Sequence, residues 1–205
     1  MSEEQHNRYF LDSEYPQTDS TLARFHVIPV PFELSVSYGT GTAHGPEAII
    51  AASAQLERLT HRKAEPGLWG IHTHDSVDCT FQTTAEEVFD RTGELMFSIY
   101  RMQGIPILLG GEHSVTNGAV RFLGRVADPV GILQFDAHMD LRHAYEGDRW
   151  SHASVMRRAV EQEIRLHQVG IRNYCEEELM ARETFGISYT DAEELSRSKG
   201  DHTGL

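Results

Sequence analysis

Apolar and polar positions alternate along the chain in blocks that predict short buried strands separated by helices. The predicted strands comprise residues 25–31, 68–72, 105–109, 130–135, 165–171 and 187–190. The predicted helices comprise residues 45–59, 84–102, 116–126, 152–162, 176–183 and 191–197. Short apolar strands that alternate with helices indicate βαβ units, and hence an α/β fold with a mostly parallel sheet covered on both faces.

The length of 205 residues suits one domain. Residues 1–23 are polar and rich in turn-forming residues, so we expect them to form an N-terminal arm. Residues 24–205 would then make up a single domain. The last predicted helix is followed by no further strand, so the alternating pattern stops before its next unit is complete.

The charge balance narrows the class of partner. Thirty-one acidic residues against 18 basic residues give a formal net charge of −13. Binding to nucleic acid needs a basic footprint, so we expect no nucleic-acid partner, whereas a small cationic substrate is compatible with this charge. No apolar run approaches the roughly 20 residues of a membrane span, and no signal-peptide pattern follows the polar start. We therefore expect a cytoplasmic protein with no membrane partner.

Several conspicuous residues have ordinary interpretations. Cys79 and Cys175 are too few for a disulfide scaffold and are expected to be plain thiols. His72 and His74 are expected to be exposed loop histidines rather than metal ligands. The acidic run at residues 176–178 is expected to be the solvated start of a helix.

Polar clusters follow two of the buried strands, where open α/β sheets bind their ligands. They are residues 110–114 (GGEHS) and residues 136–140 (DAHMD). The alternation of Asp136, His138 and Asp140 points three side chains to one side of an extended segment. Two carboxylates and an imidazole form a mixed oxygen and nitrogen site that suits Mn²⁺, Zn²⁺ or Fe²⁺.

A histidine from the neighbouring strand end, His113, could supply a further ligand. A carboxylate can also bridge two ions, which would allow a two-metal arrangement. The alternative is a set of hydrogen-bonded structural residues. Three polar groups beside apolar walls are costly unless they are paired or bind a cation, and this cost favours the metal interpretation.

Three motifs in order resemble those of the ureohydrolase family, which contains arginase, agmatinase, guanidinobutyrase and formimidoylglutamase. They are residues 110–114 (GGEHS), 136–140 (DAHMD) and 151–158 (SHASVMRR). Residues 28–32, 37–49 and 146–153 look most like the agmatinase branch. The resemblance implies the three-layer α/β/α sandwich of arginases and histone deacetylases, with a mainly parallel sheet.

The resemblance also implies roles for particular residues. Asp136 would bridge two Mn²⁺ ions, with His113 and Asp140 on one ion and His138 on the other. His152 matches the family histidine that acts as proton shuttle or general acid near the leaving amine. The implied reaction is hydrolysis of agmatine to putrescine and urea by a hydroxide that bridges the two ions, a step of polyamine biosynthesis. The resemblance further implies a homo-oligomer.

Two features leave alternatives open. The substrate tail is not identified by the motifs, so a guanidinobutyrase or another guanidino-acid hydrolase is the alternative to an agmatinase. The family's second Asp-x-Asp metal motif is not found after residue 140, so the domain is expected to be truncated at its C-terminus. A truncated, non-catalytic homologue is therefore the remaining alternative, and catalytic activity of these 205 residues alone is in doubt.

Overall fold

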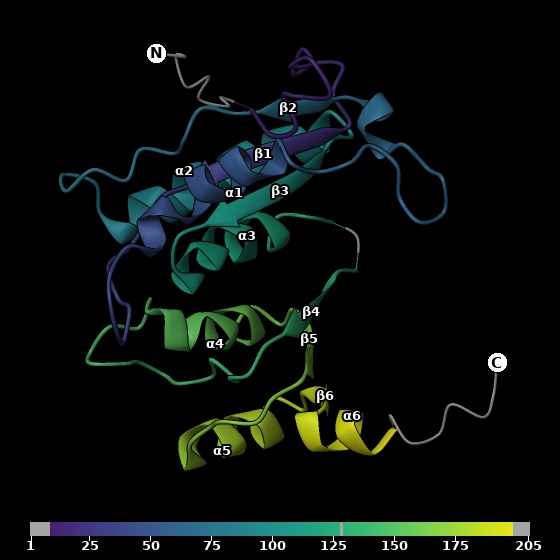
Figure 1. The fold of residues 1–205 in the computed structure, drawn as a ribbon. Helices are drawn as coiled ribbons and strands as arrows, with labels where there is room; N and C mark the ends of the chain where they lie inside the picture. The colour runs from purple at the N-terminus through teal and green to yellow at the C-terminus, as the bar shows by residue number, and fades with distance from the viewer. Residues whose placement is uncertain (1–8, 128, 199–205) are drawn as a thin grey trace. The chain divides into compact units, whose positions relative to one another are not determined.

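The computed structural model describes residues 9–127 and 129–198 (Figure 1). The strands are β1 (Phe25–Val30), β2 (Ile71–Thr73), β3 (Ile105–Gly110), β4 (Gly131–Phe135), β5 (Arg165–Val169) and β6 (Ser188–Thr190). The α-helices are α1 (Gly45–Ser53), α2 (Ala85–Arg101), α3 (Thr116–Leu123), α4 (Val155–Val160), α5 (Glu176–Thr184) and α6 (Ala192–Ser198). Among these described residues, no helix is long and apolar enough to cross a membrane.

Every predicted strand and helix overlaps one of these elements, with clear differences at the end of α1 and at the start of β2. Helix α1 ends at Ser53, whose hydroxyl donates to the Ile50 carbonyl (2.6 Å) and accepts from the Leu11 amide (2.8 Å). Such a side-chain bond competes with continuation of the helix. Before β2, Pro66–Trp69 forms a 3₁₀ turn rather than a strand, and Gly70 adopts a φ of +83°. That left-handed residue delays the start of the strand to Ile71.

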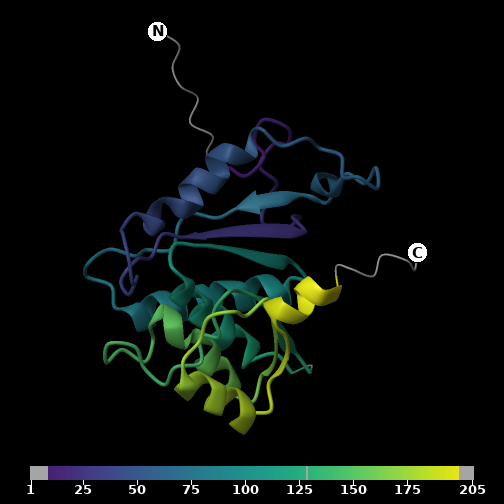
Figure 2. The ribbon, with the colours of Figure 1, turned by 60° about the horizontal axis from the view of Figure 1, so that its bottom comes forward.

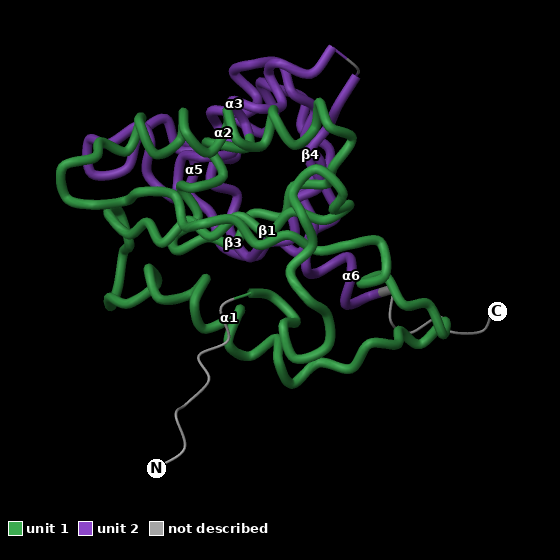
Figure 3. Tube along the Cα trace, turned by 90° about the horizontal axis from the view of Figure 1, so that it is seen from above, with its two compact units in different colours: residues 1–119 green, residues 120–205 purple. Residues whose placement is uncertain are grey.

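The chain divides into two compact units, residues 1–119 (unit 1) and residues 120–205 (unit 2) (Figure 3). In unit 1 the strand order is β2-β1-β3, which can be followed by colour in Figure 2. All pairs are parallel, and Phe25 of β1 is in register with Ile71 and Ile105. The unit 1 sheet is therefore built from segments that crossover connections separate in the sequence.

Helices cover both faces of the unit 1 sheet. Figure 3 shows α1 and α2 on opposite sides of β1 and β3. Ile28 and Val30 are fully buried, as is Phe89 of α2, whose ring meets Phe32 edge-on at 5.7 Å between centroids. Burial of each such side chain stabilises the fold by roughly 1.5–3 kcal/mol. This helix–sheet–helix layering is what the periodicity of the sequence predicts.

In unit 2 the strand order is β4-β5-β6, and these pairs are parallel as well. Helices α4 and α5 cover a common face of this sheet, where they share an apolar core with β5 and its neighbouring loops. That core consists of Met139, Leu141, Val155, Met156, Val160, Leu166, Ile171, Ala181 and Ile187. Both units thus contain a parallel sheet flanked by helices, which confirms the predicted α/β class.

The segment before β1 is bonded to the edge of the unit 1 sheet. The Thr18 amide donates to the Ile71 carbonyl (3.0 Å), and the Gln17 side chain bonds both the amide and the carbonyl of Thr73 (3.0 and 2.7 Å). The predicted division into an arm of residues 1–23 and one domain stays a prediction.

Burial raises the pKa of the Cys79 thiol to about 11, so this cysteine is protonated at neutral pH.

Three histidines form a cluster in unit 1, and the expectation of exposed loop histidines is wrong. His72 lies within β2, His74 is half-buried directly after it, and His26 of β1 is fully buried between them and α2. Their ring centroids are 4.6 to 5.9 Å apart. The parallel register of β1 and β2 pairs His26 with His72, so these imidazoles share one face of the sheet. The sequence could not supply this pairing, because it depends on which strands are neighbours.

The partners of these rings define where each proton sits. His26 Nε2 lies 3.2 Å from the Ala23 carbonyl and must donate to it, so His26 Nδ1 accepts from His74 Nε2 at 3.0 Å. His72 Nδ1 donates to the Thr18 carbonyl (2.8 Å). The rings of His26 and His72 therefore hold the segment before β1 onto the sheet, and His74 supports His26.

Acid is expected to loosen unit 1 through this cluster. Burial lowers the pKa of His26, and burial together with the neighbouring His72 lowers the pKa of His74 to about 4. In the unfolded chain such a histidine takes up a proton below its ordinary pKa of about 6.5, whereas in the folded protein it resists protonation. The folded protein is therefore fully stable above about pH 6.5, and its free energy of unfolding falls as the pH drops toward 4. The midpoint temperature of unfolding, followed by circular dichroism, should drop between pH 7 and pH 4.5, and less steeply in His74→Gln.

The matched control for that measurement is His61→Gln, since His61 is exposed. This variant should keep the pH dependence of the unaltered protein. Equal slopes in His74→Gln and His61→Gln would contradict the assignment of the effect to the cluster.

Candidate metal centre

The segment with the predicted Asp-x-His-x-Asp pattern follows β4 directly. The Asp136 amide donates to the Val169 carbonyl at 3.1 Å, which extends the pairing of β4 with β5 by one residue. Asp136 therefore sits at the carboxyl edge of the unit 2 sheet. Beyond it the chain stays bonded to the segment after β5, through an isolated parallel bridge between His138 and Asn173. This is the edge at which parallel sheets present their ligand-binding groups.

Asp136 and His138 lie side by side on this segment. The His138 amide donates to Asp136 Oδ1 at 2.9 Å, and His138 Nδ1 lies 3.5 Å from the same oxygen. The imidazole is mostly exposed, whereas the carboxylate is half-buried. Two donors on one ion with bonds of about 2.1 Å are separated by about 3.0–3.4 Å, so these atoms are close to the spacing that a shared cation requires.

Asp140 closes the segment with an unusual backbone. Its φ of +52° lies in the left-handed region, which short polar residues tolerate better than other side chains. Its carbonyl accepts from the amides of Met156 and Arg157 (3.0 and 3.1 Å), which satisfies two donors at the start of α4. Carboxylate oxygens of Asp136 and Asp140 lie within 4.8 Å of each other. The predicted ligands of unit 2 thus converge on one short turn.

Two glutamates from the start of α5 hold the chain just after Asp140. Glu178 accepts from the Leu141 amide (3.2 Å) with one oxygen and from the Cys175 amide (2.9 Å) with the other. Glu177 accepts from the His143 amide at 2.8 Å. Glu178 is only 4% exposed, so the interpretation of residues 176–178 as a solvated run is wrong for this residue.

His152 lies farther along the chain, beyond the Leu141 and His143 amides that the two glutamates bind. It starts the 3₁₀ turn His152–Ser154 and is half-buried, with the Tyr145 ring edge-on at 5.5 Å. Tyr145 is itself fixed by a two-residue turn, in which it exchanges both backbone bonds with Asp148 at 2.9 Å.

His113 belongs to unit 1, where it opens the 3₁₀ turn His113–Val115 after β3. Its neighbour Glu112 is 4% exposed and accepts from the amides of Leu34 and Ser35, each at 2.6 Å. The turn that carries His113 is thereby tied to the loop after β1. The sequence motif contains Glu112, but its role as a backbone acceptor depends on a partner loop almost eighty positions away.

The donors fit a divalent cation by their chemistry. Asp136, His138 and Asp140 offer two carboxylates and one imidazole from a rigidly bonded turn, the mixed set that Mn²⁺ or Zn²⁺ accepts. The end of the turn is held by the backbone, because the Asp140 carbonyl accepts from the amides of Met156 and Arg157 and the next amide, that of Leu141, donates to Glu178. The roles of these residues, and those of His113 and His152, stay predictions.

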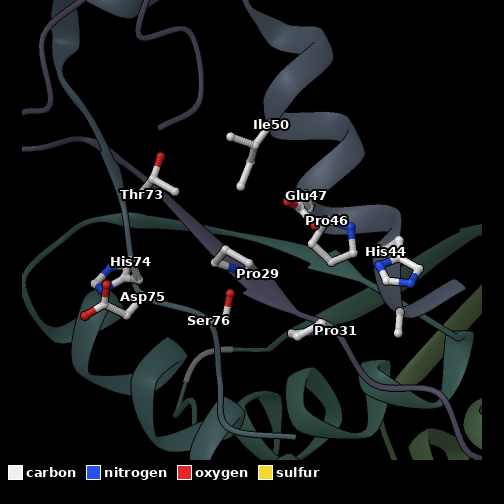
Figure 4. A pocket seen from close by; sticks show the side chains of 11 residues that line it. Pro29, Pro31, His44, Pro46, Glu47, Ile50, Thr73, His74, Asp75 and Ser76 are labelled. Atoms are coloured by element: carbon white, nitrogen blue, oxygen red, sulfur yellow. The ribbon is translucent and has the colours of Figure 1, made fainter. Parts of the chain in front are cut away.

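Unit 1 also contains a hollow of about 470 Å³ at the carboxyl ends of β1 and β2 (Figure 4). Pro29 and Pro46 provide part of its apolar wall, and Figure 4 shows Glu47 and Asp75 on different sides of it. His74 of the histidine cluster also lines it. The residues that line this hollow include none of the predicted site residues.

Loss of one acceptor at Glu178 should destabilise the turn after Asp140. Glu178→Gln keeps the size of the side chain but removes its charge, so one of the two backbone amides keeps only a neutral acceptor and the other faces an NH₂ donor. A charge-assisted hydrogen bond contributes about 1.5–3 kcal/mol, so the free energy of unfolding in urea should fall by about that amount. The control is Glu176→Gln on the exposed neighbour, which should change it by less than about 0.5 kcal/mol. Similar unfolding curves for both variants would contradict the assigned role.

Comparison with known proteins gives consistent matches along the chain. The sequence model of the arginase family matches residues 23–203. An N(1)-aminopropylagmatine ureohydrolase of Synechocystis sp. is 34% identical over 181 residues, which cover 83% of this chain and 58% of that protein. The corresponding enzyme of Thermococcus kodakarensis is 37% identical, covering 84% of this chain and 60% of that protein. An agmatinase of Pyrococcus horikoshii is 30% identical, covering 91% and 65%.

Solved structures show the same fold. The agmatine ureohydrolase of Thermoplasma volcanium superposes with a TM-score of 0.81 at 25% identity, over 92% of this chain and 63% of that one. An arginase of Medicago truncatula gives a TM-score of 0.70 at 28% identity, over 87% and 60%. The chain thus spans about three-fifths of the length of the curated relatives that it matches. The motif resemblance, the agmatinase branch and the arginase-like fold are confirmed. The chain belongs to the arginase family.

Proposed function

We propose that this chain carries the metal-binding turn and the proton donor of an agmatinase-like ureohydrolase, which hydrolyses a cationic guanidino compound and releases urea. One observation carries the proposal, namely the turn of residues 136–140. Carboxylate oxygens of Asp136 and Asp140 lie within 4.8 Å of each other, and the His138 imidazole lies 3.5 Å from Asp136, at the carboxyl edge of a parallel sheet. The family match over residues 23–203 supports the same conclusion.

The residues would divide the work as follows. Asp136, His138 and Asp140, with His113, would hold two Mn²⁺ ions, and the bound ions supply the Lewis acidity that makes water a sufficient nucleophile at neutral pH. Attack of water on the guanidinium carbon forms a C–O bond, and cleavage of the C–N bond to the tail then yields urea and an amine. His152 would protonate the departing amine at its nitrogen, because an unprotonated amide-like anion is a poor leaving group.

The tail of the substrate is proposed to be cationic. The formal net charge of −13 favours an amine-tailed substrate over one that ends in a carboxylate. Agmatine is the first candidate. N(1)-aminopropylagmatine is the second, because the relatives named for its hydrolysis are 34–37% identical to this chain, against 30% for the agmatinase. A guanidinobutyrase and a guanidinopropionase are 27% and 28% identical. Either cationic substrate would place the enzyme in cytoplasmic polyamine synthesis.

Urea release from three compounds tests this proposal. With Mn²⁺ present, agmatine and N(1)-aminopropylagmatine should be hydrolysed at least about tenfold faster, as kcat/KM, than 4-guanidinobutyrate, since the tail charge is reversed. Asp136→Asn should abolish the activity, because an amide cannot bridge two cations as a carboxylate does.

Asp90→Asn provides the control, since Asp90 lies on the exposed side of α2. It should retain the full rate. Preference for 4-guanidinobutyrate would instead favour the guanidino-acid alternative. Absence of urea with all three compounds would favour the non-catalytic alternative.

A further inference from the structure

Two glutamine side chains lie in the interior of unit 2, next to the metal-binding turn. Gln134 of β4 is 5% exposed and Gln168 of β5 is fully buried. The register of the parallel pair places them directly opposite each other. A buried amide costs free energy unless its hydrogen bonds are made, so the contacts of these two side chains require an account. The proposed reaction uses neither of them.

All four amide hydrogens of this pair are engaged. Gln134 Nε2 donates to Asp136 Oδ2 and to the His138 carbonyl, both at 3.3 Å. Gln168 Nε2 donates to Gln134 Oε1 (2.7 Å) and to the Met139 carbonyl (2.8 Å). The two side chains thus contact one carboxylate oxygen and two successive carbonyls of the turn. Asp136 Oδ1, in turn, accepts from the His138 amide.

An arginine sets the direction of these bonds. Arg182 of α5 is 5% exposed and donates from Nε to Gln168 Oε1 at 3.3 Å. Its two terminal nitrogens bond both oxygens of Asp191 at 3.0 Å. Because a guanidinium can only donate, the oxygen of Gln168 must face Arg182 and its nitrogen must face Gln134. The oxygen of Gln134 is then taken, and only its nitrogen can face Asp136.

We propose that Asp191, Arg182, Gln168 and Gln134 form a relay of hydrogen bonds that positions the Asp136 carboxylate and the turn around it for metal binding. The inference deepens the proposed function, on which the role of Asp136 as a ligand rests. Gln134 and Gln168 act through Asp136 and through the backbone of the turn, so they are positioning residues. Residues that hydrogen-bond a metal ligand orient it, and their loss weakens metal binding strongly.

A relay and a merely stabilising polar cluster predict different results for one substitution. Gln134→Met keeps the approximate volume and removes the donor to Asp136 Oδ2. A stabilising cluster would lower only the urea midpoint of unfolding. A positioning relay would in addition weaken Mn²⁺ binding, because Asp136 would lose the hydrogen bond that orients its Oδ2.

The control makes the same chemical change outside the relay. Gln162 lies just after α4 in the same unit, and its amide nitrogen donates to the Arg158 carbonyl at 3.4 Å. In a titration of the whole chain with Mn²⁺, followed by the electron paramagnetic resonance of the free ion, Gln134→Met should bind about 10–100-fold more weakly. Gln162→Met should bind like the unaltered protein. Equal affinity of Gln134→Met and the unaltered protein would overturn the relay.

A second readout needs no metal and separates failure of the relay from failure of the proposed function. The His138 amide hydrogen, bonded to Asp136 Oδ1 at 2.9 Å, should exchange with solvent at least about tenfold faster in metal-free Gln134→Met than in metal-free Gln162→Met. If the unaltered protein binds no Mn²⁺, the proposed function fails, and the exchange rate still decides on the relay. Unchanged exchange overturns it.

Gln168→Glu keeps the test decisive if Gln134→Met does not fold. The new carboxylate would still accept from Arg182, now as an ion pair, but would present an acceptor instead of a donor to Gln134. The amide of Gln134 should therefore turn over and direct its oxygen at Asp136, with the same loss of affinity and of His138 protection. Normal affinity together with normal His138 protection in this variant would contradict the relay.

Discussion

The carboxyl end of β4 has to place two carboxylates and an imidazole beside an apolar core, and the elements of unit 2 are arranged around that constraint. A buried polar group without a partner costs about 1–3 kcal/mol, so each backbone group of the turn needs a bond. Asp140 meets part of this need by its left-handed φ, which directs its carbonyl to the amides of Met156 and Arg157. The residue that ends the turn therefore also determines where α4 starts.

The acidic start of α5 completes the same arrangement from the other side. Glu178 is bonded both to its own helix, at the Cys175 amide, and to the chain after Asp140, at the Leu141 amide. A helix N-terminus stabilises negative charge, which makes it a favourable place for a buried glutamate. The capping bond of α5 and the bond to the turn are thus made by one carboxylate. Helix α5, the turn and the end of β4 are therefore coupled, so a substitution in one should also affect the other two.

The sequence predicted what is local and missed what depends on distant partners. Strand β3 is a continuous apolar run and β4 is apolar except for Gln134, and the predicted bounds agree with both strands to within a residue. The Asp-x-His-x-Asp spacing likewise singled out the candidate ligands, whose roles stay predictions. The end of α1 at Ser53 could not be predicted, because it depends on a bond to Leu11, 42 positions away.

The same reasoning explains the errors among the polar residues. Glu178 contacts Leu141 across 37 positions, and Gln168 contacts Gln134 across 34. His26 and His74 are 48 positions apart. Only the order of strands in the sheet brings such pairs together, and no pattern of spacing in one sequence contains that order. Buried glutamine and histidine within a predicted strand were nevertheless a usable signal, because an unpaired polar side chain is rare there.

The chemistry of the relay also suits the charge of the segment that it supports. A lysine or arginine beside Asp136 would orient the carboxylate, but its positive charge would repel a cation bound a few ångströms away. A neutral amide donates a hydrogen bond without that opposing charge. The positive charge that orients the amides belongs to Arg182, which is two side chains removed and is balanced by Asp191 at 3.0 Å. The two glutamines therefore fix the orientation of the hydrogen bond to Asp136, while Asp191 balances the positive charge of Arg182.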